Sequence, residues 1–183
     1  SSLAVSDIDQ DGYDDVLMSV QTGNNYVLFG AASFAPTISV GGFNGTNGFS
    51  ITGNPDMGFQ SITSGDINGD GYPDVLIGGT PNFSPGKIYC IFGKMRPFPA
   101  NVKVEELNGI NGFTVNGFSN FDYVGNALSV GDINADGIVD VITGTYGLNS
   151  YAGGVSIIYG SRLPFPAQLE LTGIESTCYG TNL

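Results

Sequence analysis

The sequence predicts an all-β protein, and three observations lead to this prediction. Glycine is abundant, with 29 residues in a chain of 183, and the spacing of an amphipathic helix is hard to find. Short apolar or alternating runs are bounded instead by Gly, Asn, Asp and Pro, which is the pattern of many short strands. The third observation is a repeat of about sixty residues that recurs along the whole chain.

Each repeat contains an aspartate-rich stretch: DIDQDGYDD at 7–15, DINGDGYPD at 66–74 and DINADGIVD at 132–140. A strand-like run precedes each stretch, and an apolar run follows it: DVLMSV, DVLIGG and DVITGT. A second strand then ends in an aromatic residue and a glycine: NYVLFG, KIYCIFG and VSIIYG. A proline-bearing linker comes next in all three repeats.

A further strand, NGFSITG or NGFTVNG, completes the first two repeats, whereas the third has TGIESTCYG after Leu171. The count is therefore about four strands per repeat, which favours a β-propeller over a solenoid, because propeller blades have four strands. We expect a single propeller segment over 1–183, with repeats at approximately 1–62, 63–128 and 129–183, cut within a blade at both ends.

The charge of the chain is concentrated in the three acidic stretches. Of 17 acidic residues, these stretches hold five, three and three, against five basic residues in the whole chain. A chain with no basic cluster is not expected to bind nucleic acid or anionic membrane surfaces. No apolar run reaches the length of about 18 residues that a membrane-spanning helix needs, so we expect no membrane insertion.

The chain contains no histidine. This excludes Ser-His-Asp and Cys-His catalysis, as well as any histidine-ligated zinc or iron site. We expect a protein that is not an enzyme.

The acidic stretches have the chemistry of a calcium loop. Positions 1, 3 and 5 of a tight turn direct oxygen ligands inward, and glycine at position 6 permits the bend. An EF-hand would need glutamate at position 12, where this chain has Met18, Ile77 and Thr143, and would need flanking helices. The closing carboxylate must therefore come from position 9. The alternative is a solvated turn rich in Asp, Asn and Gly.

The spaced motifs resemble FG-GAP repeats, which build the N-terminal β-propeller of integrin α subunits and occur in bacterial integrin-like proteins. The resemblance rests on the aromatic-glycine strand ends, the run GGTP at 78–81 and the acidic loops. The first repeat departs from the pattern, with SVQT at 19–22 in place of a GAP-like turn.

The resemblance implies that each loop binds one calcium ion, about three per chain, through side chains at positions 1, 3, 5 and 9 and the backbone carbonyl at position 7. The backbone carbonyl comes from Tyr13, Tyr72 or Ile138. The full ligand sets of the three loops are Asp7, Asp9, Asp11, Tyr13 and Asp15; Asp66, Asn68, Asp70, Tyr72 and Asp74; Asp132, Asn134, Asp136, Ile138 and Asp140. Because five protein groups nearly close the shell, we expect a structural and not a catalytic ion. The first loop has four ligand aspartates, so we expect it to bind most tightly if the geometry is equal.

The resemblance further implies a non-enzymatic module for extracellular or cell-surface recognition or adhesion, with a protein or glycan ligand. The alternatives are a lectin propeller and an accessory propeller domain of a larger secreted enzyme. Three blades are too few for a closed propeller. We therefore expect a homo-oligomer, a head-to-tail ring with the dimer favoured, or a part of a longer propeller.

Overall fold

The structure is a computed structural model that describes residues 1–20, 24–53, 59–79, 84–117, 119–120, 123–145 and 153–171. Over these ranges it is all-β, with thirteen strands and two single 3-10 turns. The elements are β1 (Ser2–Ser6), β2 (Asp15–Ser19), β3 (Asn25–Leu28), η1 (Val40–Gly42), β4 (Gly48–Thr52), β5 (Phe59–Gly65), β6 (Asp74–Gly79), β7 (Lys87–Ile91), β8 (Asn101–Lys103), η2 (Val104–Glu106), β9 (Gly112–Asn116), β10 (Ala127–Gly131), β11 (Asp140–Thr145), β12 (Gly154–Ile158) and β13 (Gln168–Glu170).

The strands form three sheets that follow the sequence repeat. The first sheet has the order β1-β2-β3-β4-β8, the second β5-β6-β7-β9-β13, and the third β10-β11-β12. Consecutive strands within each repeat pair in antiparallel fashion. The four-stranded repeat is therefore confirmed for the first two sheets. The outer strand of the third repeat falls after Leu171, outside the described residues.

A fifth strand in each of the first two sheets comes from the linker of the following repeat. β8 pairs in parallel with β4, and β13 pairs in parallel with β9. The sequence had suggested only linkers here. Because each linker strand hydrogen-bonds to the previous sheet, it ties neighbouring repeats together.

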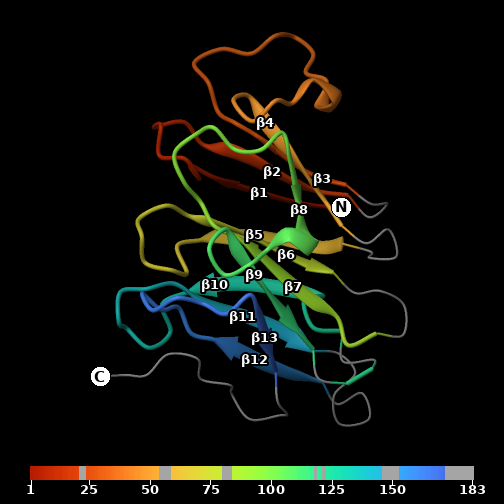
Figure 1. Cartoon of the computed structure of the whole chain (residues 1–183), viewed down its shortest axis with the longest axis vertical. Coiled ribbons are helices and arrows are strands. Elements are labelled where there is room, and N and C mark those ends of the chain that lie inside the picture. The colour runs from red at the N-terminus through yellow and green to blue at the C-terminus, as the bar shows by residue number, and fades with distance from the viewer. Residues whose placement is uncertain are drawn as a thin grey trace.

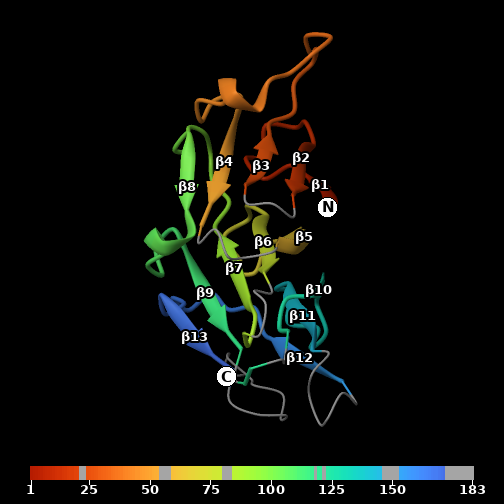
Figure 2. The ribbon, with the colours of Figure 1, turned by 90° about the vertical axis from the view of Figure 1, so that its right-hand side faces the viewer.

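The three sheets stack face to face in an open row (Figure 1). Turned by 90°, the stack shows β1, β5 and β10 along one side and the added strands β8 and β13 along the other (Figure 2). β5 contacts both β1 and β10, so the first strands bring the three sheets together.

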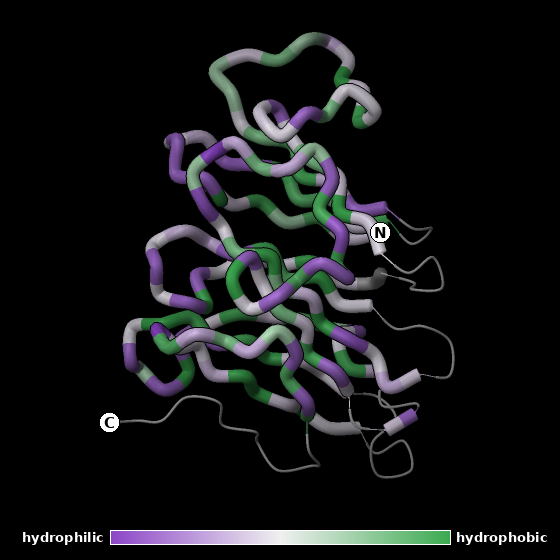
Figure 3. Tube along the Cα trace, viewed as in Figure 1, coloured by the Kyte–Doolittle hydropathy of each residue, from purple (hydrophilic) through white to green (hydrophobic). Residues whose placement is uncertain are grey.

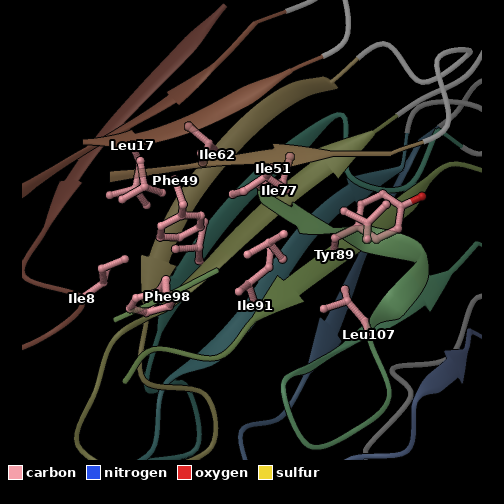
Figure 4. Close-up of a cluster of buried hydrophobic side chains, with 14 of the residues drawn as sticks. Ile8, Leu17, Phe49, Ile51, Ile62, Ile77, Tyr89, Ile91, Phe98 and Leu107 are labelled. Atoms are coloured by element: carbon pink, nitrogen blue, oxygen red, sulfur yellow. The ribbon is translucent and has the colours of Figure 1, made fainter. Parts of the chain in front are cut away.

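The core consists of two apolar layers, one on each face of the middle sheet. Leu17, Phe49 and Ile51 of the first sheet meet Ile77 and Ile91 of the second (Figure 4). On the opposite face, a second cluster joins the middle sheet to the third sheet. Its buried members include Ile67, Leu76, Ile88, Cys90, Phe113, Val141 and Ile158.

The burial pattern of the strands follows from this stacking. All six residues of β6 are buried, because the middle sheet is covered on both faces. In β2 buried and half-buried residues alternate, because only one face of the first sheet is covered. Cys90 lies fully buried in the second cluster as a small apolar residue, whereas Cys178 lies outside the described residues.

The sheet boundaries differ from the expected repeat boundaries. The boundaries after residues 62 and 128 fall inside β5 and β10. The structural unit therefore begins a few residues earlier, because the strand before each acidic loop pairs with the strand after it. In the first sheet, β1 to β4 provide four antiparallel strands.

Where the chain is described, no helix has the length and apolar character needed to cross a membrane.

Candidate metal centre

The three acidic stretches form equivalent loops at the same edge of the stack. They connect β1 to β2, β5 to β6 and β10 to β11, so strands and not helices flank each loop. The loops lie one above another on the left in Figure 1, and Figure 3 shows them as hydrophilic segments against apolar strands. All fifteen candidate ligands therefore lie in three neighbouring turns.

Each loop is held by the same four hydrogen bonds from its own backbone. The amide of position 5 donates to Oδ1 of position 1 at 3.1 Å in all three loops. The same amide donates to Oδ1 of position 3 at 3.0–3.2 Å. The glycine amide at position 6 donates to Oδ2 of position 1 at 2.9 Å. The amide of position 7 donates to Oδ1 of position 5 at 2.8–2.9 Å.

These bonds turn the side chains at positions 1, 3 and 5 into the loop. The residues concerned are Asp7, Asp9 and Asp11; Asp66, Asn68 and Asp70; Asp132, Asn134 and Asp136. Position 4 lies in the left-handed region of backbone conformation in every copy, with φ of 58° at Gln10, 68° at Gly69 and 59° at Ala135. The three loops thus share one backbone geometry although their sequences differ.

The carboxylate at position 9 is fully buried at the start of the strand that follows the loop. Asp15, Asp74 and Asp140 each have 0% exposure. One oxygen accepts a hydrogen bond from the amide of position 2, at 2.9, 2.9 and 2.8 Å respectively. The other accepts one from the glycine that ends the second strand of the repeat: Gly30 at 2.7 Å, Gly93 at 2.9 Å and Gly160 at 2.9 Å.

This arrangement explains why an aromatic residue is followed by glycine in all three repeats. A Cβ on Gly93 would lie 2.3 Å from the Pro73 carbonyl oxygen and 3.0 Å from that of Ile8. A Cβ on Gly160 would similarly lie 2.4 Å from the Val139 oxygen and 3.0 Å from that of Ile67. Only glycine permits the backbone to approach the loop closely enough to donate to the aspartate.

Burial is the main cause of the raised pKa of Asp15 and Asp74. It raises the pKa of Asp15 to about 6 and that of Asp74 to about 8. The backbone hydrogen bonds act in the opposite direction, while the neighbouring loop carboxylates raise the pKa further. Ionised Asp74 is therefore costly in the protein alone, and a nearby cation would offset that cost.

The residues present fit a hard divalent cation. One carboxylate oxygen from each of Asp7, Asp9 and Asp15 lies within 4.8 Å of the other two. Carboxylate, amide and carbonyl oxygens are the ligands that calcium prefers. Among the described residues, no hydrogen bond uses the carbonyl oxygen of Tyr13, Tyr72 or Ile138, so the expected backbone ligand is free in each loop.

The first loop differs from the others at position 3. Asn68 and Asn134 donate through Nδ2 to Oδ2 of the position-5 aspartate, at 2.9 and 2.8 Å. Asp9 has no such donor, and its Oδ2 is buried. Arg96, from the linker between β7 and β8, forms ion pairs with Oδ2 of both Asp9 and Asp11. Sequence reasoning missed this contact, because 85 residues separate Arg96 from Asp11.

A cavity of about 630 Å³ lies beside the second loop, bounded by the linkers of the second and third repeats. Asn68 and Asp70 line one side of it, and Lys94, Lys103 and Arg162 contribute basic groups. Lys103 is paired with Glu106 at 3.1 Å, and Lys94 lies 5.2 Å from the centre of the Phe98 ring.

Comparison with known proteins agrees with this repeat structure. A family model described as an FG-GAP-like repeat matches residues 7–77, and one described as an FG-GAP repeat matches residues 124–158. This chain belongs to the FG-GAP repeat family. The matched segments include the first, second and third acidic loops, so the family assignment covers every candidate site.

Two kinds of relative share the repeats. Human integrin alpha-11 is 30% identical over 159 residues, which cover 80% of this chain and 13% of the integrin. Human integrin alpha-7 is 29% identical over 135 residues, or 68% of this chain and 11% of the integrin. The phosphatidylinositol-glycan-specific phospholipase D of Bos taurus is 32% identical over 113 residues, or 56% of this chain and 13% of the enzyme. The FG-GAP chain thus spans about an eighth of these relatives.

Proposed function

We propose that this chain is a calcium-stabilised, integrin-like β-propeller module for extracellular or cell-surface recognition, without catalytic activity of its own. One observation carries the proposal: three loops with the same ligand positions and the same hydrogen bonds lie at one edge of three stacked sheets. A solvated turn would not need a buried carboxylate as well, and each loop has one.

The proposed role of calcium is structural. When bound, the ion would neutralise the loop carboxylates and complete the turn. The position-9 aspartate connects the acidic loop to the second strand of the repeat, because it accepts a hydrogen bond from the glycine that ends that strand. Five protein ligands leave little room for an activated water, and the chain has no histidine to act as a base.

Calcium binding is tested by isothermal titration of the chelated, refolded protein. We expect about three calcium ions per chain, together with weaker binding of magnesium, which seldom accepts a complete protein cage. An absence of heat and of any change in thermal stability at millimolar calcium would contradict the proposal.

Exposed apolar residues on the outer faces of the stack support the proposal of a propeller. Leu3 and Val5 of β1 are 70% and 62% exposed. They lie beside Met18 and Val16 of β2 in the register of the first sheet, so this face is apolar. The third sheet presents Val155, also exposed, at the other end. We propose that further blades cover these faces, from a second copy in a head-to-tail ring or from a longer propeller.

A second candidate function is an accessory region of a larger secreted enzyme. The similarity to a phospholipase D favours it, because the matched segment is only 13% of that enzyme. The length of the natural gene product separates the two candidates. A lectin is the remaining alternative, and binding to a glycan array without any protein partner would favour it.

A further inference from the structure

Arg96 lies where the first acidic loop lacks the hydrogen bond that the other two loops possess. In the second and third loops, the position-3 asparagine uses Oδ1 to accept the backbone amide of position 5 and Nδ2 to donate to the position-5 carboxylate. Asp9 Oδ1 accepts the same backbone amide at 3.2 Å. Asp9 Oδ2 is therefore the counterpart of the asparagine nitrogen.

Without Arg96, two carboxylate oxygens of the first loop would lie close together with no positive charge between them. Asp9 Oδ2 and Asp11 Oδ2 occupy positions that are joined by a hydrogen bond at 2.9 Å in the second loop. Neither oxygen can donate, and like charges at this separation repel. The Arg96 guanidinium bridges them, with Nε on Asp9 and Nη2 on Asp11.

On its remaining sides the guanidinium contacts loop residues of the first repeat. Nη1 donates to the Thr46 carbonyl at 3.2 Å, and Cζ lies 4.9 Å from the centre of the Phe29 ring. Phe29 is the aromatic residue of the first aromatic-glycine pair. The planar fork of an arginine suits this simultaneous bridging and stacking, whereas a lysine ammonium would not.

The Asp9 oxygen that Arg96 contacts is not the one that a cation needs. An asparagine can bind a metal only through its oxygen, so Oδ1 is the ligand atom at position 3 in the second and third loops. By equivalence it is also Oδ1 in Asp9, and Arg96 contacts Oδ2. Arg96 can thus orient Asp9 and leave its ligand atom available to the ion.

We propose that Arg96 is a positioning residue for the first metal loop, which replaces the missing asparagine amide and makes this loop dependent on the neighbouring repeat. The proposal rests on the proposed calcium function. It also removes the basis for tighter binding at the first loop, because the fourth aspartate is balanced by Arg96. In the third repeat, the corresponding linker places Arg162 against Gly69 of the second loop. Among the described residues, Arg162 forms no ion pair with an aspartate of that loop.

The test follows each loop separately by nuclear magnetic resonance during a calcium titration of the refolded chain. The amides of Gly12, Gly71 and Gly137 report on the three loops, since each donates to its position-1 aspartate at the same distance of 2.9 Å. Arg96→Met should raise the calcium midpoint at Gly12 by roughly tenfold and leave the other two within about twofold, as expected for loss of a group that orients a ligand.

Rescue distinguishes positioning from general stabilisation. Asp9→Asn combined with Arg96→Met recreates the asparagine loop, so the Gly12 midpoint should return to within about threefold of the midpoints at Gly71 and Gly137. Arg96→Lys should not restore it fully. Lys94→Met is the matched control in the same linker and should leave the Gly12 midpoint unchanged.

Two results would overturn the proposal. If Arg96→Met left the Gly12 midpoint unchanged or lowered it, Arg96 would be neutral or a competitor of the ion. An equal shift at all three glycines, or no rescue by Asp9→Asn, would indicate a general loss of structure.

Failure of the calcium function itself has a different signature, in which none of the three glycines responds to calcium. The role of Arg96 is then judged from melts of the chelated protein. Arg96→Met should lower Tm by roughly 3 °C in the natural background and by less than about 1 °C in Asp9→Asn. Equal losses in the two backgrounds would refute the bridging role.

Discussion

The ninth residue of each acidic loop connects three parts of the repeat. Asp74 begins β6, accepts a hydrogen bond from Ile67 within the loop and accepts another from Gly93 at the end of the next strand. Its carboxylate is fully buried. A loop ligand is thus also the residue that fixes the loop to the sheet, so ion binding and folding are coupled through one side chain.

Loss of one ligand should affect one ion. Asp70→Ala removes position 5 of the second loop, together with the hydrogen bond from the Tyr72 amide. In calcium we expect a fall in stability of about 1.4 kcal/mol or more, the contribution of a site with a Kd near 10⁻⁴ M at about 1 mM calcium. Thermal melts with and without calcium measure this. Asp14→Ala is the control, because Asp14 is exposed and is not a ligand.

The calcium-free protein should become less stable as the pH rises. The folded pKa of Asp15 is about 6 and that of Asp74 about 8, above the ordinary value of 3.8. The native chain therefore holds protons that the unfolded chain has released, and this stabilising contribution is lost as the pH rises from about 4, the unfolded pKa, to about 8, the folded pKa of Asp74.

Urea denaturation in calcium-free buffer at pH 6 and at pH 8.5 tests the sign. Lower stability at pH 8.5 is expected, and saturating calcium should reduce the difference by binding the ionised carboxylates. Unchanged stability of the calcium-free protein over this interval would show that the buried aspartates are already ionised at pH 6.

At the scale of the elements, the glycine after each aromatic residue decides whether the strand can reach the loop. Gly93→Ala would place a methyl group 2.3 Å from the Pro73 oxygen. We expect a loss of at least about 2 kcal/mol, because the backbone must move and Asp74 loses a donor. Gly131→Ala is the matched control, since a Cβ there meets no atom within 4 Å. Similar unfolding midpoints for the two variants would contradict this explanation of the motif.

The antiparallel strands and the acidic loops could be predicted because their signals are local. The alternation in DVLMS predicts a strand, which is β2. The motif with Asp at positions 1 and 5, Asp or Asn at position 3 and Gly at position 6 predicts the three loops, and both signals are visible within ten residues. β8 and β13 could not be predicted in this way. Their partners are β4 and β9, about fifty residues earlier, and a three-residue strand such as Asn101–Lys103 has no periodicity of its own.

The contact of Arg96 with the first loop was also beyond local reasoning. A single arginine in a proline-bearing linker has no motif, and its partners depend on how two sheets stack. One signal was available in the sequence. The first loop alone has aspartate at position 3, and an extra buried carboxylate requires a compensating cation.

At the scale of the whole molecule, the outer face of the first sheet should mediate association. Val5→Lys places a charge on a face where Val5 is 62% exposed. It should weaken association of the chains in calcium without lowering the Tm of the monomer by more than about 2 °C. Light scattering with the natural sequence gives the reference. A monomer of 19.0 kDa for the natural sequence at micromolar concentration would argue against the ring.

The most direct test of the account is the calcium dependence of stability, measured together with the number of ions bound. Three sites that each contribute about 1.4 kcal/mol should together raise Tm by on the order of 10 °C at about 1 mM calcium. Equilibrium dialysis should give about three ions per chain, one for each loop. Superimposable melts with calcium and with chelator, and no retained calcium, would show that the acidic loops are ordinary solvated turns.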